Sequence, residues 1–371
     1  MKVHCQKEDL FAGVQAALRA ISGKNTLPIL GGILLTAADG RLTFQSTDLE
    51  LAVEMTLKAD IEEEGRVLVP GKYFADLVRY LPGGYVSLAA EDGRCLQVDY
   101  DGSSTMLNCY DADEFPVFPQ VEPQVTGTID PALFRKMTKR VVIAAASDEL
   151  RPLFTGVYCK FSPDELLMVA TDTYRLALTK GSWQGDGSTE LVIPGRIMQE
   201  IARLTGDSEE PLLISCGKSQ AFFACGNITL ISRLIGGSYP DYRNVFPREE
   251  DFNWHILVNR QRFLEGLERA SILPQGGSAN KSQIVTLTWE EDKMVISSID
   301  PELGKIEENL ACEMEGESLT ASYNTRYLLD AMKVMDGEQI RLRLIGAINP
   351  GVMSPEEDEN YQYLILPLRM D

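Results

Sequence analysis

Apolar residues recur at helical spacing in three separate places along the chain. These stretches begin at Leu10, Leu133 and Phe263, and their spacing lets one face of a helix pack against a core. Each is followed by a segment in which apolar and polar residues alternate, as in strands with one buried face. These segments are residues 33–57, 156–179 and 284–312. The pattern therefore predicts three copies of one unit that mixes helices and antiparallel strands.

Each copy then continues with a short apolar strand, a second helix and further strands. A basic residue stands near the start of each second helix, at Lys72, Arg196 and Arg326. Proline and acidic residues interrupt the regular pattern between the copies, near residues 113–119 and 239–251. We therefore predict an α+β fold of three repeated domains. Their expected limits are residues 1–122, 123–249 and 250–371.

The charge of the chain is unevenly distributed. The formal net charge of −20 argues against a nucleic-acid partner when the chain is taken as a whole. The predicted helices are nevertheless each net positive, and the strands and loops carry the negative charge. These helices are residues 10–21, 72–80, 132–146, 195–204, 260–270 and 325–335. One basic helix can simply offset its own dipole, but a bias shared by all of them favours a mildly basic surface that contacts DNA loosely.

Residue patterns for catalysis or cofactor binding are not evident in the sequence. The two histidines, His4 and His255, have no partner residues at metal-ligand or triad spacing. Gly217-Lys218-Ser219 lacks the upstream glycine of a nucleotide-binding loop. The seven cysteines are scattered and form no Cys-x-x-Cys pair, so we expect reduced core residues. We therefore expect a non-catalytic protein without a cofactor.

The hydropathy pattern gives no indication of a membrane partner. No apolar run approaches the roughly 18 residues that a spanning helix needs. The first residues also lack the hydrophobic core of a secretory signal. We therefore expect a cytoplasmic protein.

Five segments spread along the chain carry a more specific signal. They are Asn25-Thr-Leu-Pro-Ile-Leu-Gly-Gly, Ser46-Thr-Asp-Leu-Glu, Ala170-Thr-Asp-Thr-Tyr-Arg-Leu-Ala, Tyr239-Pro-Asp-Tyr-Arg-Asn-Val-Phe-Pro and Leu364-Ile-Leu-Pro-Leu-Arg. Together they resemble the bacterial DNA polymerase III β subunit, the family of β sliding clamps. The resemblance implies a head-to-tail homodimer that closes a ring around duplex DNA, with helices lining the hole and sheets outside.

The resemblance also implies which residues meet each partner. A hydrophobic groove for a short peptide motif would involve Phe154, Thr171, Thr173, Tyr174, Arg175, Leu176, Pro240, Val245, Leu364, Ile365, Leu366, Pro367, Leu368 and Arg369. The helix charges and the resemblance together suggest the DNA-facing residues Lys24, Arg79, Arg135, Lys136, Lys139, Arg140, Arg196, Arg203, Arg262 and Lys333. The joint between two copies would involve Leu107, Ile272 and Leu273.

The partners implied in this way are double-stranded DNA, bound without sequence preference, and a second copy of the chain. The DNA polymerase III α subunit, the clamp loader δ subunit, and other polymerases and repair proteins with clamp-binding motifs would share the groove. Two alternatives stay open at this point. A binding scaffold that forms no ring would be monomeric, and a hydrolase built on a carboxylate pair would lose turnover when one aspartate is replaced.

Overall fold

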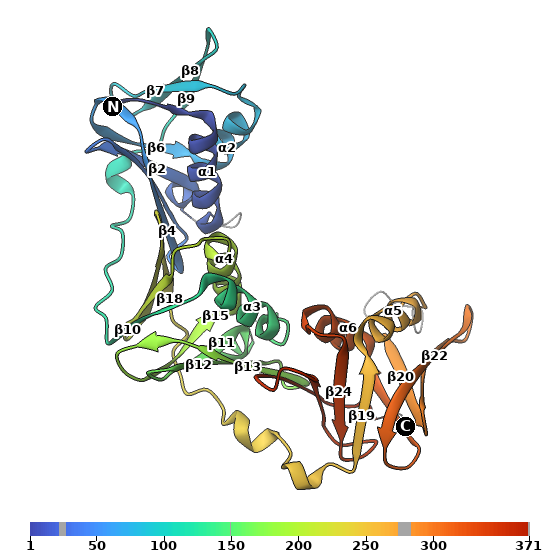
Figure 1. The fold of residues 1–371 in the computed structure, drawn as a ribbon. Helices are drawn as coiled ribbons and strands as arrows, with labels where there is room; N and C mark the ends of the chain where they lie inside the picture. The colour runs from blue at the N-terminus through green and yellow to red at the C-terminus, as the bar shows by residue number, and fades with distance from the viewer. Residues whose placement is uncertain (22–26, 149, 274–282, 370–371) are drawn as a thin grey trace.

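The chain folds into three similar units that follow one another along an arc (Figure 1). The computed structural model describes residues 1–21, 27–148, 150–273 and 283–369. Within these residues each unit has two α-helices that pack against each other, α1 with α2, α3 with α4, and α5 with α6. Figure 1 shows these helices on the concave side of the arc and the sheets on its convex side. No helix in the described ranges is long and apolar enough to cross a membrane.

The helices lie close to their predicted positions. They are α1 (Lys7–Ala17), α2 (Gly71–Tyr80), α3 (Pro131–Val142), α4 (Gly195–Thr205), α5 (Arg260–Ala270) and α6 (Thr325–Val334). Side-chain oxygens of Asp130, Asn259 and Asn324 accept backbone N–H groups at the starts of α3, α5 and α6. Helix α3 ends at Val142, before the predicted residue 146. The chain continues there in tighter turns, in which the N–H of Ala144 donates to the carbonyl of Val141.

The strands form two groups in each unit. In the first unit these are β2 (Gly32–Ala38), β3 (Arg41–Thr47), β4 (Leu51–Lys58) and β6 (Gly65–Pro70), and β1 (Lys2–Gln6), β5 (Asp60–Glu63), β7 (Tyr85–Ala89), β8 (Cys95–Tyr100) and β9 (Ser103–Asn108). In the second they are β11 (Gly156–Phe161), β12 (Glu165–Thr171), β13 (Arg175–Ser182) and β15 (Thr189–Pro194), and β10 (Val125–Ile129), β14 (Gln184–Gly185), β16 (Leu212–Cys216), β17 (Gln220–Cys225) and β18 (Ile228–Arg233). In the third they are β20 (Ile284–Glu290), β21 (Lys293–Asp300), β22 (Gly304–Glu315) and β23 (Leu319–Asn324), and β19 (Trp254–Asn259), β24 (Gln339–Leu344), β25 (Gly351–Pro355) and β26 (Tyr361–Ile365).

Neighbouring units are joined because they share sheets. Strand β4 of the first unit pairs antiparallel with β18 of the second, and Leu51 lies opposite Ser232. Strand β13 of the second unit pairs in the same way with β26 of the third, and Arg175 lies opposite Ile365. Each joint is therefore a continuous antiparallel sheet, whose backbone hydrogen bonds tie one unit to the next.

The strands that correspond to these two pairs in the first and third units each have an open edge. Strand β9 pairs only with β8, and it is the last strand of the first sheet. Residues 304–311 of β22 pair only with β21, while the far end of β22 turns to pair with β19. In the described part of the chain, one side of β9 and one side of this segment of β22 have no strand partner. Exposed strand edges are sites where another chain can add a strand.

The cores lie between helices and sheets within each unit. In the first unit, α1 approaches β3 so closely that a side chain at Gly13 would clash with the ring of Phe44. The sequence predicted that the cysteines are reduced core residues, and this holds for five of them. The buried free thiols are Cys5, Cys159, Cys216, Cys225 and Cys312. Burial raises the pKa of Cys5 to about 12. Cys95 and Cys109 are also free but only partly buried.

Candidate functional site

A turn that occurs in all three units positions the central residues of the site. In the second unit the hydroxyl of Thr171 donates to the carbonyl of Arg175, 2.6 Å away, and the Asp172 carboxylate accepts the N–H groups of Tyr174 and Arg175. Thr173 adopts a left-handed backbone conformation, with φ of 79°. The first unit has the same turn around Asp48. This turn ends β12, begins β13 and projects residues 173–176 towards the third unit.

A cavity of about 230 Å³ opens beside this turn, where the second unit, the third unit and the segment between them meet. Its lining residues are Phe154, Thr171, Thr173, Tyr174, Arg175, Leu176, Tyr239, Pro240, Asp241, Tyr242, Val245, Leu364 and Leu366. Leucine, valine, proline and aromatic side chains dominate this set, and Tyr174 and Val245 stay 60% and 46% exposed at its rim. The cavity therefore offers an apolar groove with hydroxyl and carboxylate groups at its edge, which suits a short peptide with large apolar side chains.

Most of the groove residues expected from the sequence meet at this cavity, and four do not. Ile365 follows Leu364 on β26, so its side chain points to the opposite face of the sheet and is buried in the main core. Leu368 pairs through its backbone with Ser322, and Pro367 and Arg369 flank it outside the lining. The expectation that the Ile365 side chain lines the groove is therefore wrong.

Three lining residues were missed by the sequence reasoning. Tyr239, Asp241 and Tyr242 lie in the same segment as the predicted Pro240 and Val245. The segment Tyr239-Pro-Asp-Tyr carried the signal, because aromatic residues are unusual in a plain linker between domains. The Tyr239 ring stacks on Tyr158 at a centroid distance of 5.2 Å, so the segment packs firmly on the second unit.

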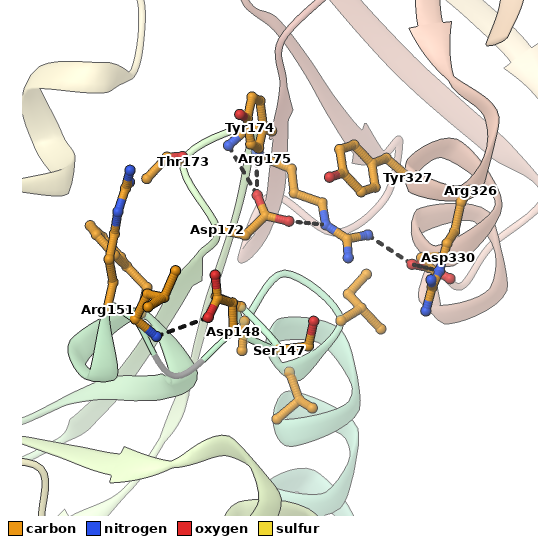
Figure 2. Close-up of a pocket in the computed structure, with 16 residues that line it drawn as sticks. Ser147, Asp148, Arg151, Asp172, Thr173, Tyr174, Arg175, Arg326, Tyr327 and Asp330 are labelled. Carbon is orange, nitrogen blue, oxygen red and sulfur yellow. Dashed lines mark hydrogen bonds and ion pairs between the residues drawn. The ribbon is translucent and has the colours of Figure 1, made fainter. Parts of the chain in front are cut away.

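Arg175 links the groove to the third unit (Figure 2). Its guanidinium donates to Asp172 at 3.0 Å and to Asp330 of α6 at 2.8 Å, and it lies 4.1 Å from the ring centroid of Tyr327. Burial alone would lower the pKa of Arg175, but the Tyr363 hydroxyl and these carboxylates outweigh it and raise the pKa. Arg175 therefore stays charged and fixes the turn against α6.

A second cavity, drawn in Figure 2, lies on the other side of this ion pair. Its volume is about 640 Å³, and it shares Phe154, Thr173, Tyr174 and Arg175 with the groove. Its remaining lining comes from Asp172, from described residues between α3 and Arg151, and from α6. The groove and this cavity are thus separated by one layer of side chains.

The basic residues expected to face DNA mostly lie exposed on the helices of the concave side. Arg79, Lys139, Arg203, Arg262 and Lys333 are exposed and form no ion pair with another described residue. Others are already paired: Arg135 with Asp207, Lys136 with Asp336, and Arg196 with Asp48 and Glu50. Lys24 lies outside the described residues. The free positive charge on the helices is therefore smaller than the sequence count suggests.

The structure contradicts the expectation that Arg140 faces DNA. Only 3% of Arg140 is exposed, and its guanidinium forms ion pairs with Asp336 at 3.0 Å and Asp358 at 2.8 Å. It also lies 4.8 Å from the ring centroid of Tyr361. Because these partners belong to the third unit, Arg140 joins two units and is not available to DNA. Burial disfavours the ionised form of Asp336, but Lys136 and Arg140 outweigh this and lower its pKa.

The residues expected at the joint between two copies lie at the two ends of the arc. Leu107 is on β9, the open edge of the first unit. Ile272 and Leu273 follow Ser271, the residue that caps the end of α5 in the third unit, and they are 70% and 9% exposed. The end of α5 is held beside β22, because Arg269 forms an ion pair with Glu308 at 2.8 Å.

Comparison with known proteins agrees with this architecture over the whole chain. Models of the DNA polymerase III beta subunit match its N-terminal domain at residues 1–119, its central domain at 128–241 and its C-terminal domain at 243–369. The beta sliding clamp of Bacillus subtilis is 34% identical over 381 residues, covering 100% of both chains. The crystal structure of the Bacillus subtilis DNA polymerase sliding clamp superimposes with a TM-score of 0.94 at 32% identity and covers 100% of both chains. A Pseudomonas aeruginosa sliding clamp bound to griselimycin gives a TM-score of 0.93 at 25% identity, again with 100% coverage of both.

The fold and these similarities define the class of DNA sliding clamps. The chain belongs to the DNA polymerase III beta subunit family, and its function is that of a sliding clamp.

Proposed function

We propose that two copies of this chain join head to tail into a ring around duplex DNA, and that each copy holds partner proteins in the groove between its second and third units. The repeated sharing of sheets between units carries this proposal, because the edges that would continue it, one side of β9 and one side of residues 304–311 of β22, have no strand partner in the described ranges. The three units are proposed to span residues 1–122, 123–249 and 250–371.

The register of the ring joint can be worked out from the two joints inside the chain. Leu51, Arg175 and Leu303 hold the same place in this turn, because each lies three residues after the turn aspartate that accepts its N–H group. The turn of the third unit is one residue longer, because Gly304 stands between Leu303 and the first residue that pairs as Ala52 and Leu176 do. Their partners Ser232 and Ile365 are each the fifth residue of the strand that they occupy. The fifth residue of β9 is Leu107. Counted from the turn aspartate, this register places Leu303 of one copy opposite Leu107 of the next.

Side chains near the two edges suit such a joint. Leu303 is 64% exposed and Ile272 is 70% exposed, although both are large apolar residues. They flank β22, Leu303 just before its first residue and Ile272 at the end of the helix held to it by Arg269. Covering these side chains with a second copy would remove apolar surface from water and complete the backbone hydrogen bonds of both edges. The interface is heterologous, because a surface of the first unit meets a different surface of the third unit. A ring forms when the rotation that relates one copy to the next closes after two copies.

DNA would pass through the hole of the ring, whose inner surface is lined by the helices. Five exposed cations that pair with no acid among the described residues offer exchangeable contacts to phosphates, and such contacts read no sequence. They are Arg79, Lys139, Arg203, Arg262 and Lys333. The net charge of −20 repels DNA from the remaining surfaces. Topological enclosure then keeps the protein on DNA while weak contacts let it slide.

The groove would hold partner proteins through short apolar motifs. The DNA polymerase III α subunit, the clamp loader δ subunit, and other polymerases and repair proteins are the partners proposed for it. Since one groove per chain serves all of them, they compete for it. The chain would act in the cytoplasm as a non-catalytic processivity factor, and a loader would supply the energy for opening the ring.

Fluorescence anisotropy of a labelled Gln-Leu-x-Leu-Phe peptide tests the groove. The parent chain is compared with Val245→Asp, which places a carboxylate in the apolar lining, and with Val117→Asp as a matched control. Val117 lies between the first and second units and is 94% exposed. We expect saturable binding by the parent and the control, and a loss of roughly tenfold or more for Val245→Asp, because the carboxylate would be desolvated by the peptide.

Equal binding by all three proteins would contradict the groove assignment. Native mass spectrometry of the same samples tests the ring. A dimer supports the closed ring, whereas a strictly monomeric parent at micromolar concentration would favour the plain scaffold.

A further inference from the structure

A large cavity on the second unit adjoins the groove and differs from it in charge. Its volume is about 790 Å³. Tyr239, Pro240, Asp241 and Tyr242 line both cavities, so the two are neighbours on either side of this short segment. Residues that flank the motif of a peptide bound in the groove would therefore lie close to this cavity.

The cavity is preformed by backbone hydrogen bonds around it. The N–H of Leu234 donates to the carbonyl of Ser219, and the N–H of Ile235 donates to that of Val192, both at 2.9 Å. These bonds hold the segment after β18 against the turn between β16 and β17 and against β15. The stacked rings of Tyr158 and Tyr239 close the side next to the groove. A ligand would thus meet a fixed wall and would not have to order it.

The charge of this cavity is opposite to that of the chain. Its acidic residues are already paired, Glu190 with Lys160 at 3.3 Å and Asp241 with Arg243 at 2.8 Å. Two further cations, Lys218 and Arg233, also line it. Both are exposed, and neither forms an ion pair within the described part of the chain. In a protein of net charge −20, this leaves a concave site with two uncompensated positive charges.

We propose that this cavity, through Lys218 and Arg233, binds acidic residues that flank the apolar motif of a peptide seated in the groove. The proposal rests on the groove function proposed above. It adds a specificity element, because partners with acidic residues on the correct side of the motif gain charge pairs that other partners lack. These pairs form at an exposed site, so their contribution is moderate and depends on salt.

The test compares three labelled peptides that share one Gln-Leu-x-Leu-Phe motif. One is neutral, one carries three aspartates before the motif, and one carries three aspartates after it. They are titrated at low salt with the parent, with Lys218→Glu/Arg233→Glu, and with the control Arg41→Glu/Lys58→Glu. Arg41 and Lys58 are exposed cross-strand neighbours in the first unit, so the control makes the same change in net charge far from the groove.

We expect one of the two acidic peptides to bind the parent roughly three- to tenfold more tightly than the neutral peptide. This gain should persist in the control and vanish in Lys218→Glu/Arg233→Glu. The neutral peptide reports on the groove alone, since Lys218 and Arg233 do not line it.

Several outcomes would overturn the proposal. These are no gain for either acidic peptide, an equal gain for both, a gain that survives Lys218→Glu/Arg233→Glu, or a loss in the control as well. Failure of the neutral peptide to bind the parent would instead refute the groove function, and this proposal with it. Binding of a short single-stranded oligonucleotide that is lost in Lys218→Glu/Arg233→Glu would reassign the cavity to nucleic acid.

Discussion

Replacement of Leu303 by serine should weaken the ring without unfolding the chain. Leu303 is 64% exposed, and its N–H donates to Asp300, a bond that serine retains. Complete burial of a leucine contributes roughly 1.5–3 kcal/mol, so burying the exposed part contributes about 1–2 kcal/mol at each joint. A closed dimer has two joints, which brings the loss to about 2–4 kcal/mol, or roughly a 30- to 1000-fold rise in the dimer dissociation constant.

Analytical ultracentrifugation over nanomolar to micromolar concentrations measures this constant. Ile348→Ser is the matched control, because Ile348 is 66% exposed and lies between β24 and β25, away from both open edges. Circular dichroism melts should be the same for the parent and both variants. A dissociation constant for Leu303→Ser within threefold of the parent would refute the register that pairs Leu303 with Leu107. An equal shift in Ile348→Ser would refute the assignment as well.

Three further results are expected. Ile272→Asp should give folded monomers by native mass spectrometry, because a charge would be buried at the joint. Leu273→Asp should also give monomers but with some loss of stability, because Leu273 is already buried within the chain. Arg175→Met should lower the free energy of unfolding by about 3 kcal/mol in urea titrations, since it leaves the Asp172 carboxylate, whose side chain is only 12% exposed, without its cation; a loss below 1 kcal/mol would contradict this. Because the folded-state pKa of Asp336 is lowered, its stabilisation is present above roughly pH 4 and is lost as the pH falls through the folded value. The melting temperatures of the parent and Asp336→Asn should therefore differ at pH 7 and converge once the pH is below the folded-state pKa.

The helices could be predicted from the sequence because their signal is local. Apolar spacing and capping residues such as Asp130 and Asn259 act within a few positions, and the observed helices lie close to the predicted ranges. The pairing of β4 with β18 and of β13 with β26 was not predicted, since it depends on residues far apart in the chain. The way in which the units join therefore had to come from the structure or from the family resemblance.

The error at Arg140 has a physical cause that the sequence already contained. Counting charges on a helix ignores which face they occupy. The buried face of α3 includes Phe134 and Met137, and Arg140 follows Met137 by three positions, which places it on that same face. What could not be predicted is why an arginine is tolerated there, because its partners Asp336 and Asp358 come from the third unit.

The two internal joints also explain why repetition alone could not locate the groove. The turn around Asp48 and the turn around Asp172 have the same backbone hydrogen bonds, yet the charges that close each joint are reversed. In the first joint the turn supplies the acid, and Arg196 of α4 reaches Asp48 at 3.0 Å. In the second joint the turn supplies the base, and Arg175 reaches Asp330 of α6. Duplication preserved the turn as a connector, while divergence of single side chains decided which joint presents a hydroxyl, a tyrosine and an apolar groove to a partner.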